Sequence, residues 1–318
     1  MAANFRYRWS LVVLVITAVL WSDAPGALAQ TVYRSGQSVQ PVYEGWNENQ
    51  DGTFTMWFGY LNRNYEETPI VPVGPDNHFS PGPTDRGQSA FFYPRRQNFV
   101  FSVTVPANWG DQDLVWTVIH DGTAYTAVGS LWPTWVVDEG VWRANRGAGL
   151  GGRDGQEAFA NRPPTLRFDI DTTVTTTVGR PVTLTVLAGD DGQPGPQPDR
   201  LQRRQRGYAP LPNDLPTIGG RRSGAASGVG GPTDQNMVKV RNAYQTGLAV
   251  TWLVHRGSGA VMFDPSVVPV DLADGQAFTT ATFSRPGIYI IRAVADDGSF
   301  ATGANVTVRV HGDPTDRR

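Results

Sequence analysis

Four histidines are the side chains of this 318-residue sequence that are best suited to acid–base or metal chemistry near neutral pH: His78, His120, His255 and His311. None lies in an H-E-x-x-H element or in any i, i+4 pair, so the sequence indicates no zinc-hydrolase site. A G-x-S-x-G element and a phosphate-binding glycine loop ahead of a helix are also missing. Because there is no cysteine, thiol nucleophiles, disulfides and cysteine-bound zinc are excluded. We therefore expect neither an enzyme nor a cofactor.

Carboxylates are the second set of residues with chemical potential, and they gather in the C-terminal half. The aspartates concerned are Asp190, Asp191, Asp264, Asp296 and Asp297. Oxygen-rich ends of β-sandwiches sometimes hold calcium, but the D-x-D-x-D-G loop is absent and Asp-Gly ordinarily makes a turn. We expect turns here and no metal site, with calcium as the alternative.

Tryptophan is concentrated in the first half of the sequence. Of the eight tryptophans that follow the first 29 residues, seven precede residue 145: Trp46, Trp57, Trp109, Trp116, Trp132, Trp135 and Trp142. Alternation places Trp57 and Trp116 on strands, where core packing is the default. Three others stand beside turn residues, where an indole can stack on a sugar or fill a pocket of a partner, although core or interdomain packing is the alternative for each. The candidate ligand-binding residues are therefore Trp109, Trp132 and Trp135, with Asn62, Arg63, Asn64 and Asp76 as polar partners.

The first 29 residues have the order of a secretory signal peptide. Arg6 and Arg8 precede an apolar run from Leu11 to Leu20, and Ala27-Leu28-Ala29 precedes Gln30. We expect cleavage after Ala29 and a periplasmic or extracellular protein, with an uncleaved anchor as the alternative. No later run reaches the roughly 18 apolar residues that a spanning helix needs, so no membrane span is expected in the mature chain.

Short alternating runs punctuated by turn residues predict an all-β protein of two antiparallel sandwiches. Asp-Gly pairs at 51–52 and 121–122 indicate hairpin turns, while the Pro- and Gly-rich stretch 68–88 is expected to be a long functional loop. The expected organisation is a signal peptide (1–29), an N-terminal β-sandwich (30–139), a Gly-rich linker (140–161), a second β-sandwich (162–311) with a disordered insertion (193–243), and a tail (312–318).

The second domain resembles the PKD-type, immunoglobulin-like modules of extracellular proteins. The resemblance rests on an ordered set of short motifs: Arg162-Pro163-Pro164, Ala188-Gly189-Asp190-Asp191-Gly192, Val250-Thr251-Trp252, Gly259-Ala260-Val261-Met262-Phe263, Thr280-Ala281-Thr282-Phe283, Pro286-Gly287-Ile288-Tyr289 and Ala295-Asp296-Asp297-Gly298. It implies a spacer or protein–protein module, and the insertion departs from the pattern. On physical grounds, we expect Trp252 in the core and Tyr289 at a corner.

The first domain is similar to a group of uncharacterised secreted bacterial proteins. The similarity lies in Glu44-Gly45-Trp46, Phe58-Gly59-Tyr60-Leu61-Asn62-Arg63-Asn64, Gly74-Pro75-Asp76-Asn77, Arg86-Gly87-Gln88 and Gly129-Ser130-Leu131. It implies a discrete domain and no particular chemistry.

Charge and composition narrow the class of partner. A formal net charge of -2 and a pI near 6.1 give no overall attraction to nucleic acid. We expect a secreted, non-catalytic binding or scaffold protein that contacts an envelope or extracellular protein. The alternatives are a carbohydrate-binding protein that uses the turn tryptophans, an accessory subunit of an exported enzyme or transport complex, and an enzyme in which His78 or His120 meets a carboxylate in a cleft.

Overall fold

The computed structural model describes residues 33–138, 140–141, 161–169, 173–193, 247–297 and 300–312. These residues all belong to one compact unit. The predicted signal peptide, most of the predicted linker, all but one residue of the predicted insertion and most of the tail lie outside the described residues, as does Trp142. The described residues mainly form strands joined by turns, which confirms the all-β fold class. No helix in this part of the chain is both long and apolar enough to cross a membrane.

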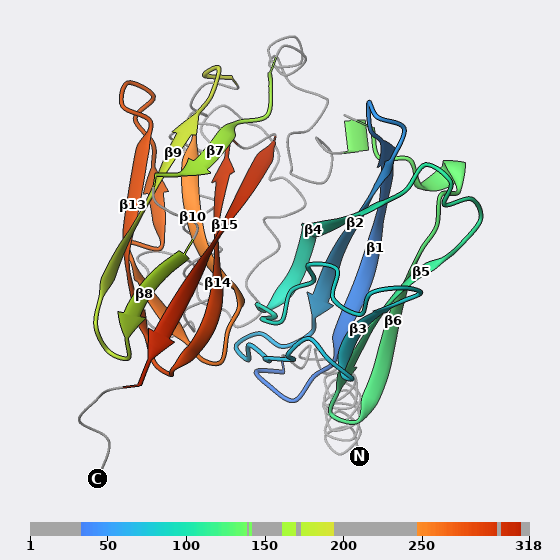
Figure 1. Cartoon of the computed structure of the whole chain (residues 1–318), viewed down its shortest axis with the longest axis horizontal. Coiled ribbons are helices and arrows are strands. Elements are labelled where there is room, and N and C mark those ends of the chain that lie inside the picture. Colours follow the sequence, from blue (N-terminus) through green and yellow to red (C-terminus); the bar gives the residue numbers. More distant parts are fainter. Residues whose placement is uncertain are drawn as a thin grey trace, which may run out of the picture. The chain divides into compact units, whose positions relative to one another are not determined.

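Two three-stranded antiparallel sheets form the first sandwich (Figure 1). One sheet has the order β1 (Val39–Glu48), β2 (Phe54–Asn62), β4 (Arg95–Val105), and the other has the order β3 (Asn77–Ser80), β5 (Leu114–His120), β6 (Thr123–Gly129). Burial alternates along β1, so one set of side chains faces the core and the other faces outward.

Aromatic rings fill the core of this first sandwich. The Trp116 ring centroid lies 4.9 Å from that of Phe101 and 6.0 Å from that of Phe79, and all three side chains are buried. Trp116 is therefore a core residue, as its position in an alternating run predicts. Trp57 lies on the opposite face of β2 from Phe58 and is partly buried, with its indole N–H donating to Asn47 Oδ1 at 2.6 Å.

Both predicted Asp-Gly hairpin turns are present. Gly52, between β1 and β2, has φ 79°, and Asp121 and Gly122, between β5 and β6, have φ 49° and 72°. Two consecutive positive φ values belong to the turn type that matches the twist of a hairpin, which is why Asp-Gly is the favoured pair.

The stretch 68–88 is largely irregular, as expected, but it contains one short strand that the sequence does not indicate. Strand β3 lies within it and pairs with β5, His78 opposite Thr117. The buried Asn77 side chain donates to Val71 O at 2.9 Å and to Ser89 O at 2.8 Å, and it accepts the Trp116 indole N–H at 2.9 Å. A single amide thus ties the stretch to the core by three hydrogen bonds, a long-range arrangement that local composition does not reveal.

The second sandwich has the strand order of an immunoglobulin-like domain. One sheet has the order β11 (Val261–Asp264), β13 (Gln276–Phe283), β9 (Val182–Gly189), β7 (Thr165–Phe168). The other has the order β12 (Val267–Pro269), β10 (Ala249–Arg256), β14 (Gly287–Asp296), β15 (Ala301–His311), β8 (Thr173–Thr177), with β8 parallel to β15 and the remaining pairs antiparallel.

Trp252 and Tyr289 take the positions that the sequence predicts. Trp252 is fully buried in the core, with its ring centroid 6.0 Å from that of Phe168. Tyr289 stands near the start of β14, and its hydroxyl donates to Arg285 O at 2.8 Å, back across the corner. This is the tyrosine corner of immunoglobulin-like sandwiches, which fixes the entry into the strand.

Candidate functional site

Two of the predicted ligand-binding residues, Asn62 and Asn64, are fully buried. Asn62 Nδ2 donates to Glu67 O at 2.8 Å and to Phe92 O at 3.0 Å, while Asn64 Nδ2 donates to Gln37 O at 3.0 Å. The two amides also bond to each other. Their burial corrects the expectation that they face a ligand, because their polar atoms satisfy the backbone of three crossing segments instead.

The other predicted polar residues, Arg63 and Asp76, are exposed. Asp76 O accepts the N–H of Ile119, near the end of β5, and Arg63 follows the end of β2. Trp109 is buried at 7% exposure and donates to Gln112 O at 2.7 Å, so its indole packs rather than faces solvent. The seven predicted residues do not converge on one site.

Trp132 and Trp135 differ from the rest, since they are 66% and 47% exposed. They flank and end the 3-10 turn Pro133–Trp135, and we name the segment 132–136 the tryptophan turn. Trp132 is the extended residue before the turn, and the Trp135 ring centroid lies 5.5 Å from that of Tyr43, but both indoles leave apolar surface exposed to solvent. The neighbouring Val136 is 44% exposed and extends this surface.

Hydrogen bonds to β1 fix the tryptophan turn in place. Trp46 Nε1 donates to Trp132 O at 2.9 Å, and Val137 N donates to Trp46 O at 2.8 Å. Gly45 is required at the contact, because a Cβ there would lie 2.3 Å from Trp135 O and the residue has φ 125°. The exposed indoles are thus presented by a backbone that is already ordered, which lowers the entropic cost of binding.

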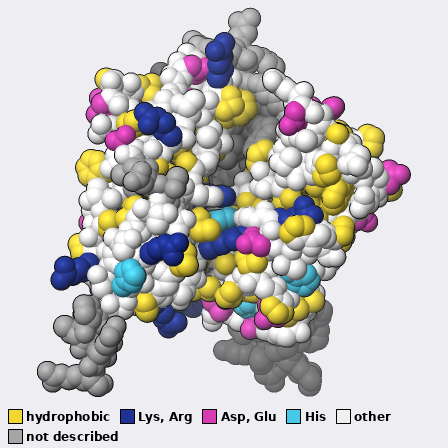
Figure 2. Space-filling model, viewed as in Figure 1, with side chains coloured by type: hydrophobic (Ala, Val, Ile, Leu, Met, Phe, Trp, Pro, Cys, Tyr) yellow, Lys and Arg dark blue, Asp and Glu magenta, His cyan; other side chains and the backbone are white. Residues whose placement is uncertain are grey.

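The residues best suited to catalysis form no catalytic cluster among those described. His78 Nδ1 lies 2.9 Å from Pro75 O, and His120 Nδ1 lies 3.2 Å from the carboxylate of its neighbour Asp121 at a hairpin turn. Across the described ranges, no group of three or more histidine and acidic side chains is placed to hold a metal ion. In Figure 2, charges of both signs are interspersed over the visible face rather than collected into a stripe of one sign.

A polar seam joins the segment 85–93 of the first sandwich to β10 of the second. His255 is 4% exposed, and its Nε2 lies 2.8 Å from Gly87 O, while Ala90 N donates to His255 O at 3.0 Å. Next to it, Arg256 makes a bidentate pair with Asp85 at 2.7 and 3.0 Å. The Phe91 ring packs into the hydrophobic core cluster of the second sandwich. These contacts couple the two sandwiches, and no local pattern in the sequence predicts them.

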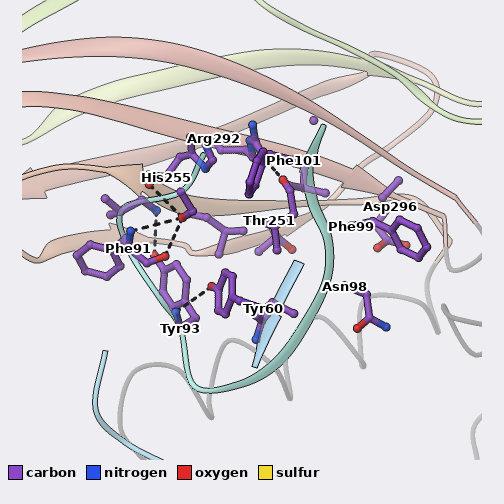
Figure 3. Close-up of a pocket in the computed structure, with 18 of the residues that line it drawn as sticks. Tyr60, Phe91, Tyr93, Asn98, Phe99, Phe101, Thr251, His255, Arg292 and Asp296 are labelled. Atoms are coloured by element: carbon purple, nitrogen blue, oxygen red, sulfur yellow. Dashed lines mark hydrogen bonds between the residues drawn. The ribbon is translucent and has the colours of Figure 1, made fainter. Parts of the chain in front are cut away.

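Beside this seam lies a cavity of about 570 Å³ (Figure 3). Its walls come from β4 and the segment 89–94 on one side and from the outer face of β10, β14 and β15 on the other. The labelled aromatic residues around it are Tyr60, Phe91, Tyr93, Phe99 and Phe101. A volume of this size, largely apolar walls and a few polar groups are the usual properties of a small-molecule pocket.

Arg292 of β14 is the basic group at one end of this cavity. Its Nε donates to Asn305 Oδ1 at 2.8 Å, and its Nη1 contacts Val100 O across the two sandwiches. Burial, followed by the repulsion of Arg256, lowers the pKa of Arg292 to about 10. Alternation along 289–295 indicates that Arg292 faces away from the core, but it does not indicate that another sandwich covers it. Sequence reasoning therefore missed this residue.

Comparisons with known proteins leave the family open. No protein-family model matches, and no curated protein matches. Among solved structures, the chain is similar to domains 4 and 5 of the S-layer protein SbsC (11% identity, 63% of this chain and 66% of that one, TM-score 0.24). It is also similar to the fibronectin(III)-like modules of Clostridium thermocellum CbhA (11%, 93% and 96%, 0.24) and to the D0-D1 domain of intimin (12%, 85% and 97%, 0.23). At such scores the neighbours decide nothing, and the immunoglobulin-like assignment of the second sandwich rests on its strand order.

Proposed function

We propose that this chain is an exported, non-catalytic binding or scaffold protein that acts in the cell envelope through protein–protein contact. The tryptophan turn is the contact site, and the PKD-type domain 162–311 serves as the supporting module. The single observation that carries the proposal is the exposure of Trp132 and Trp135, at 66% and 47%, on a turn held rigidly by β1.

The size of the exposed surface is adequate for a binding hot spot. Covering the exposed parts of both indoles removes roughly 200 Å² from water, or about 5 kcal/mol before the costs of association are subtracted. Tryptophan is enriched among residues that dominate binding energies, and a rigid scaffold lets more of this gross energy appear as affinity.

Carbohydrate binding through the same turn is the second candidate. It is favoured by the exposure of two indoles only three residues apart, because each exposed flat ring could stack on a sugar. The buried Asn62 and Asn64 take no part in this version of the site. An accessory role beside an exported enzyme or transporter would use the turn in the same way as the main proposal.

The test compares the wild-type chain with Trp132→Ala/Trp135→Ala in two assays, crosslinking in the native envelope and a glycan array. Phe278→Ala is the matched control, because Phe278 is an exposed aromatic residue (57%) on β13 of the other sandwich. Crosslinks to a protein that vanish in the double variant, but persist in the control, support protein contact. Glycan binding that is lost in the double variant, but persists in the control, supports carbohydrate binding instead of protein contact. Partners that are captured equally by all three proteins overturn both versions.

A further inference from the structure

The cavity between the sandwiches has one property that separates it from a packing defect: a cation, Arg292, that has no counter-ion in the described part of the chain. No carboxylate among the described residues forms an ion pair with Arg292. Its hydrogen bonds to Asn305 and Val100 leave most of the five N–H donors of the guanidinium available to a ligand. A partly buried, unpaired charge is costly unless something compensates it.

Neighbouring carboxylates do not relieve this cost. Arg256 is paired with Asp85 across the seam, which leaves no carboxylate of that pair for Arg292. Asp296, which also lines the cavity, is four residues away on the same strand, or about 13 Å along β14. The Arg292 end of the cavity is therefore electropositive and suited to an anion.

The remaining walls determine what the anion must be attached to. Phe91, Phe99 and Phe101 line the cavity together with Tyr60 and Tyr93 (Figure 3). These rings favour an apolar body, which would displace water from a largely hydrophobic surface. A strongly hydrated inorganic anion would gain nothing from this surface.

We propose that this cavity binds a small organic acid, with its carboxylate on the Arg292 guanidinium and its aromatic or aliphatic body against the rings of the first sandwich. The site is separate from the tryptophan turn and does not depend on the function proposed for that turn. A guanidinium suits a carboxylate because its N–H groups match the two oxygens in a planar, bidentate arrangement.

The test measures binding of 3-phenylpropionate and decanoate to the full chain by calorimetry and by the fluorescence of Trp57, which lines the cavity. The neutral amide 3-phenylpropionamide is the matched probe without charge. We expect the acids to bind and the amide to bind at least about tenfold more weakly, since a charge-assisted hydrogen bond is lost.

Three variants locate the site. Arg292→Gln should reduce acid binding to the level of the amide. Gly303→Leu should abolish binding of both probes by filling the cavity, because a Cβ at Gly303 meets Arg292 Cδ at an ordinary 3.7 Å and creates no backbone clash. Arg309→Gln removes an exposed cation from β15 and should leave binding unchanged.

The proposal is overturned if none of the probes binds at millimolar concentration, or if the acid and the amide bind equally. It is also overturned if Arg292→Gln and Gly303→Leu both bind the acids as the wild type does. A peptide that ends in a free C-terminal phenylalanine and binds where the small acids do not would identify a chain terminus as the occupant instead, and would equally overturn it.

Discussion

Acid should destabilise this protein through the single buried imidazole of His255. The ring lies under the segment 85–93, with Nε2 2.8 Å from Gly87 O. Burial first, and then the positive charge of Arg292, lower the pKa of His255 from 6.5 to about 3. The folded protein therefore keeps the ring neutral at pH values at which the unfolded chain protonates it.

The sign and size of the effect follow from this difference. Between pH 6.5 and about 3 the unfolded state binds more protons at this position, so the free energy of unfolding falls as the pH is lowered through that window. Relative to pH 7.5, His255 should lower the stability by about 2–3 kcal/mol at pH 4.5.

The assay is urea denaturation at pH 7.5 and pH 4.5 for the wild type and for His255→Gln. Glutamine can donate to the same carbonyl and does not titrate. All other groups contribute alike to both proteins, so the wild type should lose about 2–3 kcal/mol more than the variant over this range. His311→Gln, at an exposed position on β15, should follow the wild type. Equal losses by the wild type and His255→Gln would refute the reasoning.

Three further variants test individual contacts. Burial, with repulsion from Asp297, raises the pKa of Asp190 to about 6, so the folded protein is destabilised when this carboxyl is ionised at pH 7. Asp190→Asn should therefore stabilise the protein at pH 7 by about 1 kcal/mol in urea denaturation, after allowance for solvent screening. The advantage should vanish below about pH 4, where the carboxyl is protonated in both the folded and the unfolded state. Gly45→Ala should cost about 2–4 kcal/mol in the same assay and change the near-ultraviolet circular dichroism, because the added Cβ collides with Trp135 O. Tyr289→Phe should cost about 1–2 kcal/mol by removing the corner hydrogen bond, without loss of the fold by far-ultraviolet circular dichroism.

Several features of the fold were accessible from local sequence. Period-two alternation identified β2, β4, β5 and β6 and the main strands of the second sandwich, because a half-buried strand must place alternate side chains in the core. Asp-Gly pairs identified two hairpin turns for the equally local reason that their central residues need positive φ. Trp252 and Tyr289 were predictable because their motifs carry their structural roles within a few residues.

The candidate site was predictable only in part. A tryptophan beside a turn can pack or project, and the sequence does not distinguish the buried Trp109 from the exposed Trp132 and Trp135. Their difference depends on whether another segment covers the ring. The same limit applies to Asn62 and Asn64, whose polarity suggested exposure but whose amides bond to backbone groups from distant segments.

By itself, the sequence determined the all-β class, the turns, most strands and the residues at which an immunoglobulin-like corner forms, since each of these follows from the chemistry of a few adjacent residues. Only the tertiary structure decided that Phe91 belongs to the core cluster of the second sandwich, that His255 is held neutral, and that Arg292 lies beside an aromatic cavity with no counter-ion among the residues described. These properties depend on which side chains meet from positions more than a hundred residues apart, as in the contact of Arg292 with Val100 O. Burial and charge are properties of that assembled surrounding, whereas alternation and turn preference are properties of the chain itself.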